Sequence, residues 1–169
     1  MAVGHLVNLF MTGDFTMPVQ IKDLDGKVLY TNPNVDSLRK LDLRGKSLPR
    51  ADFRGLDITE MVLSNADIHG SDFSKATCRR VEFSMADARS SVFEDTDLYG
   101  SRWVATKLGD SVFRRAIIKG NWFYKADFGP QAVTWEDLRQ IEDVTFLCSD
   151  VPWFVGKFPA DYKVALTIR

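Results

Sequence analysis

The sequence predicts an all-β fold in which the chain winds repeatedly around one axis as a solenoid. Three observations predict it. From residue 41 to residue 130 the chain divides into eighteen five-residue blocks without an insertion. The third residue of every block is apolar, and the first residue is Ala, Ser or Thr in twelve of the eighteen. Neither a helical period of about 3.6 residues nor a strand-like alternation produces this pattern.

Residues that are 20 positions apart are predicted to lie above one another, because large central residues recur at that spacing. One predicted column holds Phe53, Phe73, Phe93 and Phe113, and a second holds Leu43, Leu63, Phe83, Trp103 and Phe123. Four blocks per coil then give about 4.5 coils and a rod of roughly 22 Å. Lys46 and Asn121 occupy first positions, which should point inward. We expect the Lys46 side chain to reach solvent and Asn121 to need a main-chain partner.

The blocks ADFRG (51–55), ADIHG (66–70), TDLYG (96–100) and ADFGP (126–130) resemble the A-(D/N)-(L/F)-X-X motif of the pentapeptide-repeat family. The resemblance covers residues 41–130. It implies a right-handed quadrilateral β-helix in which four blocks make one coil, with successive coils joined by main-chain hydrogen bonds.

The two ends of a solenoid need covers, because unpaired main-chain groups and apolar columns end there. Residues 1–40 are expected to form an N-terminal cap, with a β-hairpin that turns at Asp25-Gly26 and with Leu38 as an incomplete extra block. The GKVL stretch in this segment is similar to one that precedes the coils in some bacterial and phage members of the family. Residues 131–169 are expected to hold a helix from Thr134 to about Glu142 and a tail that forms strands, a wrap over the rod or an oligomer contact.

Composition places the chain among ordinary globular proteins, with 45% apolar and 27% charged residues. A net charge of −1 predicts no general attraction to nucleic acid or to an anionic membrane. The apolar stretch from His5 to Met11 lacks a basic leader, and no run reaches the roughly 20 apolar residues of a membrane span. Two cysteines, Cys78 and Cys148, are too few for a disulfide framework. We therefore expect a soluble, cytoplasmic protein.

The sequence contains no grouping that is typical of an enzyme, a metal site or a cofactor site. Aspartate recurs at the second position of the blocks, where a catalytic pair, a calcium site or a DNA-mimicking stripe is the alternative to an ordinary role in turns and solubility. These residues are Asp42, Asp52, Asp57, Asp67, Asp72, Asp87, Asp97 and Asp127. His69 has no second ligand at metal spacing, Cys78 falls on an inward position, and Cys148 has no His motif. We expect neither catalysis nor a bound cofactor.

Two groups of outward residues are candidate binding surfaces. Apolar residues beside the Phe83–Trp103 column predict one exposed stripe, covered by the C-terminal tail, by a second copy of the chain or by a partner protein. They are Val62, Met85, Val104, Trp122 and Tyr124. A candidate basic patch lies in residues 101–130, whose net charge is +4, and it consists of Arg102, Lys107, Arg114, Arg115 and Lys119. Solvation, or neutralisation by the acidic residues 136–143, explains it more simply than nucleic-acid binding.

The leading functional hypothesis is a non-catalytic protein-interaction module that presents a rigid solenoid surface to a partner that the sequence does not identify. A homodimer is one form of this hypothesis. The family resemblance implies an alternative, because certain bacterial members form rods that resemble B-form DNA and modulate DNA gyrase. Such a mimic needs a continuous negative surface, whereas residues 41–130 carry a net charge of +1. The third hypothesis is an enzyme or small-molecule site within residues 131–169.

Overall fold

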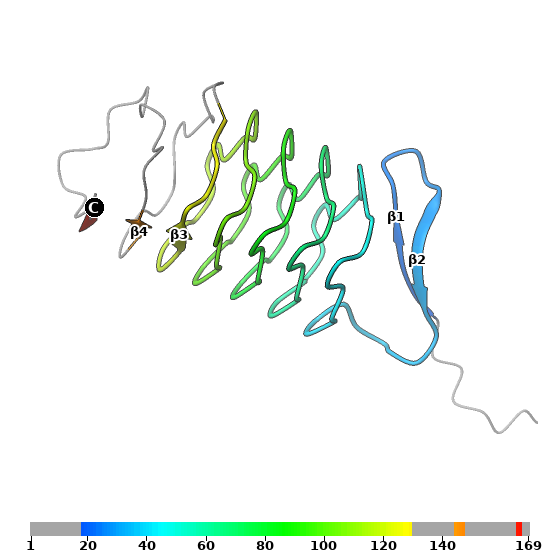
Figure 1. Cartoon of the computed structure of the whole chain (residues 1–169). Coiled ribbons are helices and arrows are strands. Elements are labelled where there is room, and N and C mark those ends of the chain that lie inside the picture. Colours follow the sequence, from blue (N-terminus) through cyan, green and yellow to red (C-terminus); the bar gives the residue numbers. More distant parts are fainter. Residues whose placement is uncertain (1–17, 130–143, 148–164, 167–169) are drawn as a thin grey trace, which may run out of the picture.

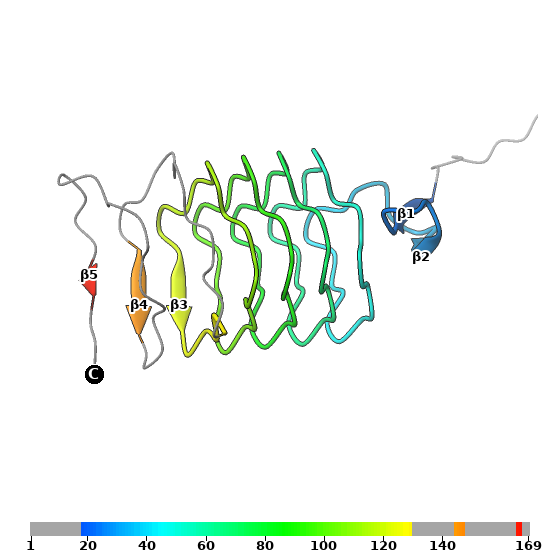
Figure 2. The same ribbon diagram turned by 90° about the horizontal axis from the view of Figure 1, so that it is seen from above.

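The structure is a computed structural model that describes residues 18–129, 144–147 and 165–166. A row of similar coils follows an N-terminal hairpin, and two short strands lie beyond the last coil (Figures 1 and 2). No helix occurs in these three described ranges, so none there has the length and apolar character of a membrane span. The predicted helix between Thr134 and Glu142 lies outside the described residues.

The coils stack in parallel with a period of 20 residues. The second residue of each block forms a β-bridge with the residue 20 positions later, from Asp42↔Val62 to Lys107↔Asp127. Main-chain hydrogen bonds join the coils at the same period: the N–H of Phe53 donates to the carbonyl of Asp72 over 2.9 Å. The observed coil therefore contains four five-residue blocks, as the recurrence of large residues predicts.

Each block ends in a corner with a left-handed backbone conformation. From Lys40 to Lys125, every fifth residue has a positive φ, and thirteen of these eighteen residues are not glycine. A hydrogen bond closes the turn, as where the N–H of Ala66 donates to the carbonyl of Leu63 over 3.0 Å. Lys40 adds one corner below the first predicted block, and its N–H donates to Thr59. The incomplete block predicted at Leu38 is therefore partly formed.

The interior consists of the predicted columns of central residues. Phe53, Phe73, Phe93 and Phe113 stack with ring centroids 4.7–4.8 Å apart, which equals the usual spacing of hydrogen-bonded strands. The neighbouring column of Phe83, Trp103 and Phe123 also stacks, and it meets the first column edge to face. These rings are fully buried. Edge-to-face and offset-stacked contacts are the arrangements that aromatic rings prefer.

Small polar residues at first positions bond to the main chain inside the solenoid. The hydroxyl of Ser91 donates to the carbonyl of Ile68 over 2.9 Å, and the same bond recurs at other Ser and Thr residues. Asn121 follows this pattern, since its Nδ2 donates to the carbonyl of Leu98 over 2.7 Å. Its Oδ1 accepts a 2.6 Å hydrogen bond from the indole of Trp103. The predicted main-chain partner of Asn121 is thus present.

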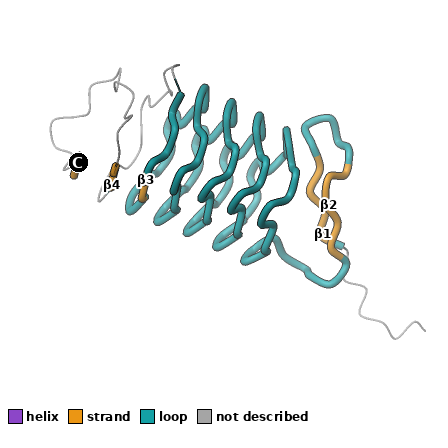
Figure 3. The backbone as a smooth tube through the Cα atoms, in the orientation of Figure 1, coloured by secondary structure: helices purple, strands orange, loops and turns teal. Residues whose placement is uncertain are grey.

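The predicted hairpin is formed by β1 (Val19–Lys22) and β2 (Val28–Asn32), which pair antiparallel with a bulge. The turn is held by the Asp23 carboxylate, which accepts the N–H groups of Asp25 and Lys27 at 3.0 and 2.9 Å. Gly26 supplies the positive φ of 86° that this turn requires. Figure 3 shows β1 and β2 beside the first coil.

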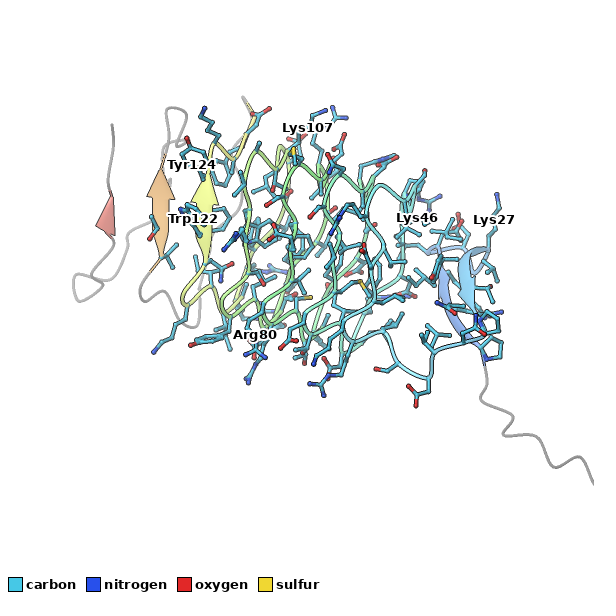
Figure 4. The ribbon with its side chains drawn as sticks, turned by 60° about the horizontal axis from the view of Figure 1, so that its bottom comes forward. Lys27, Lys46, Arg80, Lys107, Trp122 and Tyr124 are labelled. Atoms are coloured by element: carbon cyan, nitrogen blue, oxygen red, sulfur yellow. The ribbon has the colours of Figure 1, made fainter. Side chains whose placement is uncertain are left out.

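The hairpin is bonded to the first coil. The N–H of Leu24 donates to the carbonyl of Arg50 over 2.9 Å, and the N–H of Asp52 donates to Lys22 over 2.8 Å. Arg50 also forms a 2.7 Å ion pair with Asp25 at the turn. Ile21 is buried with the solenoid core. The hairpin therefore extends the core at the N-terminal end, where Lys46 of the first coil is exposed as expected (Figure 4).

The C-terminal end continues one side of the solenoid. Strand β3 (Trp122–Tyr124) pairs in parallel with β4 (Thr145–Leu147), and β4 pairs in parallel with β5 (Ala165–Leu166). Figure 2 shows the three strands side by side. The register shifts by 23 residues from Trp122 to Thr145 and returns to 20 from Thr145 to Ala165. Of the three possibilities for the tail, these two segments are strands.

Candidate interaction surface

The outer surface is described by its four sides, each named after its inward central residue in the coil of residues 101–120. The Trp103 side, the Leu108 side, the Phe113 side and the Ile118 side follow one another around the axis. On each side the second residue of a block is a β-bridge position, and the fourth and fifth residues form the next corner.

All five residues of the predicted apolar stripe belong to the Trp103 side, but they do not form a continuous stripe. Val62 and Trp122 share one outward column, in which Glu82 and Arg102 lie between them. Met85 is exposed at the corner one coil below Val104, and its N–H donates to the carbonyl of that residue. The prediction of one unbroken stripe is therefore wrong, because the bridge column changes from apolar to charged and back.

The apolar part is concentrated in the last two coils, around Trp122 and Tyr124. Their rings lie 6.0 Å apart on β3, and Tyr124 is 36% exposed (Figure 4). The Arg102 guanidinium lies 5.0 Å from the centroid of the Trp122 ring, and the Lys125 ammonium lies 5.4 Å from that of Tyr124. Cations over aromatic faces are attracted by the ring quadrupole. We call Arg102, Val104, Trp122, Tyr124 and Lys125 the aromatic–cation cluster.

The predicted basic patch does not exist as one surface. Arg102 lies on the Trp103 side, Lys107 on the Leu108 side, Arg114 and Arg115 on the Phe113 side, and Lys119 on the Ile118 side. These residues span nearly a whole coil, so their side chains point in four directions. The prediction of a patch is wrong for this reason.

Four of these five cations instead lie beside acids of the preceding coil. Arg102 and Lys107 approach Glu82 and Asp87 at 3.7 and 4.0 Å. Arg114 pairs with Glu94 at 2.7 Å, and Arg115 pairs with Asp95 at 2.8 Å. In each pair the two residues are 20 positions apart. The basic excess of the last coils is thus largely matched by the acids below it.

The same pairing occurs lower on the rod and changes the acidity of its carboxyl groups. Arg80 donates two hydrogen bonds to Glu60, which also lies 3.5 Å from Lys40. The hydrogen bond from Arg80 is the largest cause that lowers the pKa of Glu60 below its usual value. Arg54, within the same block as Asp52, likewise lowers the pKa of that carboxyl group by hydrogen bonding.

A shallow groove that the sequence does not predict lies on the Ile118 side. It has a volume of about 320 Å³, and its lining residues are Arg79, Asp97, Tyr99, Ile117 and Lys119. Tyr99 is 43% exposed. The Asp97 carboxylate accepts hydrogen bonds from the Arg79 Nε at 2.7 Å and from the Tyr99 N–H at 3.1 Å. The sequence signal was the 20-residue spacing, which places Ile117 above Asp97.

The titratable residues considered for catalysis have structural surroundings. The Nδ1 of His69 lies 2.6 Å from the Asp67 carboxylate on an exposed corner. Cys78 is buried as a free thiol, and burial raises its pKa well above the usual value. A thiol so held is a poor nucleophile. No group of three or more potential metal ligands occurs within residues 18–129, 144–147 and 165–166, and Cys148 lies outside them.

Comparisons with known proteins bear on the fold. No protein-family model and no curated protein matches the chain. A crystal structure of a pentapeptide repeat protein, Rfr23 from the cyanobacterium Cyanothece 51142, is similar with a TM-score of 0.41 and 17% identity, over 63% of this chain and 88% of that one. A pentapeptide repeat protein of the Arabidopsis thaliana thylakoid lumen is similar with a TM-score of 0.32 and 26% identity, over 48% and 64%.

A further solved structure, QnrB1, is described as a plasmid-mediated fluoroquinolone resistance protein. It is similar with a TM-score of 0.31 and 14% identity, over 64% of this chain and 61% of that one. The stronger evidence lies within the chain itself: the five-residue period, the parallel register of 20 residues and the four inward columns. By these features the chain is a pentapeptide-repeat protein.

Proposed function

We propose that this protein is a non-catalytic protein-interaction module that docks a partner protein on the aromatic–cation cluster of the Trp103 side. The observation that carries the proposal is the placement of aromatic residues. Tyr99, Trp122 and Tyr124 are the outward-facing aromatic residues of residues 41–129, and all three lie in the last two coils. Every other aromatic ring in that range belongs to a buried column.

Outward aromatic residues fit a docking role better than a purely structural one. Trp and Tyr side chains dominate the binding energy of many protein interfaces. Arg102 and Lys125 contact the two rings of β3 and restrict their rotation. A side chain that is already ordered loses less conformational entropy when a partner binds. The main chain beneath β3 is bonded to coils on both sides, so it presents the cluster on a rigid base.

In the same proposal, residues 41–130 form about 4.5 right-handed coils that are closed at both ends. The hydrogen bonds between Leu24 and Arg50 and between Asp52 and Lys22 support the hairpin as the N-terminal cap. Strands β4 and β5 support residues 131–169 as the C-terminal cap. The buried free thiol of Cys78 fits a reducing compartment, so we place the protein in the cytoplasm.

The test is capture of proteins from a lysate of the source cells on the immobilised full-length chain. The test variant is Trp122→Ser/Tyr124→Ser. The control variant is Val92→Ser/Val112→Ser, which changes two half-buried outward residues of the Phe113 side. We expect one partner to be retained by the wild type and the control and lost by the test variant, with all three chains showing cooperative unfolding. Equal capture by all three would contradict the proposal, and so would capture by none.

The alternative function, modulation of DNA gyrase by mimicry of duplex DNA, has less support. A duplex mimic presents unpaired negative charges. In this chain Asp52, Glu60 and Asp87 each accept hydrogen bonds from an arginine of the same chain. A gyrase supercoiling assay distinguishes the two functions, because a change in supercoiling at equimolar protein would favour the alternative.

A further inference from the structure

The corner between the Ile118 side and the Trp103 side has no side chains in the last two coils. It is formed by Gly100 and Gly120, whose φ values are 69° and 68°. The nearest side-chain atom to a Cβ on Gly120 would belong to the ring of Tyr99, at 4.0 Å. The corner is therefore a low saddle. The groove lies on one side of it and the aromatic–cation cluster on the other.

The two sides that meet at this corner have an uneven charge. In the last two coils they carry the cations Arg102, Lys119 and Lys125 and a single acid, Asp97. Asp97 is already engaged by Arg79 and by a main-chain N–H group. The surface around the saddle is therefore cationic and aromatic.

The groove beside the saddle has room for one side chain of a ligand. Its volume of about 320 Å³ is at the lower end of the range for ligand pockets. Tyr99 and Ile117 supply an apolar wall, while Arg79 and Lys119 supply positive charge at its edge. An apolar side chain that is flanked by acidic residues matches this arrangement.

We propose that the saddle binds an extended acidic segment of a partner protein, which crosses the corner at Gly100 and Gly120. Its carboxylates meet Arg102 and Lys119, and one apolar side chain enters the groove between Tyr99 and Ile117. This inference rests on the proposed function and names the chemistry of the partner. Charge complementarity is its main argument, because opposite charges around an apolar anchor steer association and set specificity.

A protein segment fits this surface better than a nucleic acid. Nucleic-acid binding depends on many simultaneous phosphate contacts. Two of the cations here, Arg79 and Arg102, already lie beside acids of this chain, at 2.7 and 3.7 Å. Such partly neutralised cations favour a ligand with a few well-placed charges over a polyanion.

The test measures fluorescence anisotropy of a fluorescein-labelled synthetic peptide in which Glu alternates with Gly around one central Leu. The full-length chain is titrated against it, and oligo(dT) of equal length is titrated in parallel. The test variants are Arg102→Glu and Tyr99→Ser. Arg54→Glu on the Phe113 side is the matched control, since Arg54 and Arg102 both have 54% exposed side chains beside an acid. Thermal unfolding shows that each variant is folded.

We expect saturable binding of the acidic peptide that weakens with added sodium chloride. Arg102→Glu should weaken it at least about tenfold, and Arg54→Glu by less than about twofold. Tyr99→Ser should weaken binding of the peptide with Leu and leave binding of an all-Glu/Gly peptide unchanged. No saturable binding by the folded wild-type chain, equal losses in the two arginine variants, or tighter binding of oligo(dT) overturns the inference.

Failure of this inference is distinguishable from failure of the proposed function. A captured partner that depends on Trp122 and Tyr124 but is indifferent to Arg102→Glu overturns the acidic segment alone. A partner indifferent to all three residues overturns the docking surface itself.

Discussion

The inside and the outside of the same coils obey different rules. One inward column runs Leu43, Leu63, Phe83, Trp103 and Phe123, and all five residues are large, apolar and buried. The outward column beside it runs Asp42, Val62, Glu82, Arg102 and Trp122, in which acid, aliphatic, base and aromatic follow one another. The interior repeats because each coil must pack on the next at one spacing. The exterior is free to vary, so specific function belongs there.

The largest effect should come from the interior. Phe93 stacks between Phe73 and Phe113 and contacts Trp103 edge to face. Phe93→Ala should lower the free energy of unfolding by about 3–5 kcal/mol, because it opens a cavity between two coils. Urea denaturation followed by circular dichroism measures this loss. Phe93→Leu is the control and should cost less than half as much, and a loss under about 1 kcal/mol for Phe93→Ala would contradict a tightly packed column.

A smaller effect should follow from the one buried amide in the column of small residues. Asn121→Ala removes the acceptor of the Trp103 indole and the donor to the Leu98 carbonyl. Unfolding free energy should fall by about 1–3 kcal/mol, since both buried groups lose their partners. Asn121→Ser is the control, because Ser and Thr make the corresponding bond in other coils. It should be less destabilising than Asn121→Ala, and the reverse order would refute this role.

The corners allow a test on the border between inside and outside. Gly45 has a φ of 68° and no atom within 4 Å of the position that a Cβ would occupy, whereas Gly109 lies outside the positive-φ region. Gly45→Ala should therefore destabilise the chain by about 1 kcal/mol through backbone strain alone. Gly109→Ala should be neutral or slightly stabilising, because Ala restricts the unfolded chain. Thermal unfolding compares the two, and equal effects would show that the corners tolerate any residue.

The outside should give the smallest effect, and it should depend on pH. The hydrogen bond from Arg89 is the largest cause that lowers the pKa of Asp87 below its usual value. A lowered folded-state pKa contributes stability above about pH 4, and this contribution is lost as the pH falls through the folded pKa. Asp87→Asn should flatten the acid side of the profile of Tm against pH. An unchanged profile would mean that the surface pair contributes nothing.

The fold could be predicted from the sequence because the interior is periodic. A repeat of five with large residues every 20 positions defines the coil, its columns and the inward direction of Asn121. The hairpin could be predicted from its Asp25-Gly26 turn. Strand β4 was missed because three extra residues separate Thr145 from Trp122, which breaks the period although Val144, Thr145 and Phe146 resemble a repeat block.

The surface was predicted less well because sequence proximity misleads on a solenoid. Residues from Arg102 to Lys119 are close in sequence and lie on four sides. Residues that are 20 apart, such as Glu94 and Arg114, are the true neighbours. Applying the 20-residue spacing to charges, as well as to the core, separates the predicted basic patch and brings Ile117 above Asp97 beside Tyr99. Val62 and Met85 belong to the predicted stripe by side, but charged residues interrupt it.

Site-specific photo-crosslinking tests the central claim most directly, namely that the partner docks on the Trp103 side. A benzoylphenylalanine is placed at position 122 in one chain and at position 92, on the Phe113 side, in another. The account predicts that irradiation in the source cells joins one partner protein to the chain labelled at position 122 and none to the chain labelled at position 92. Crosslinking of the same partner from both positions, or from position 92 alone, would contradict it.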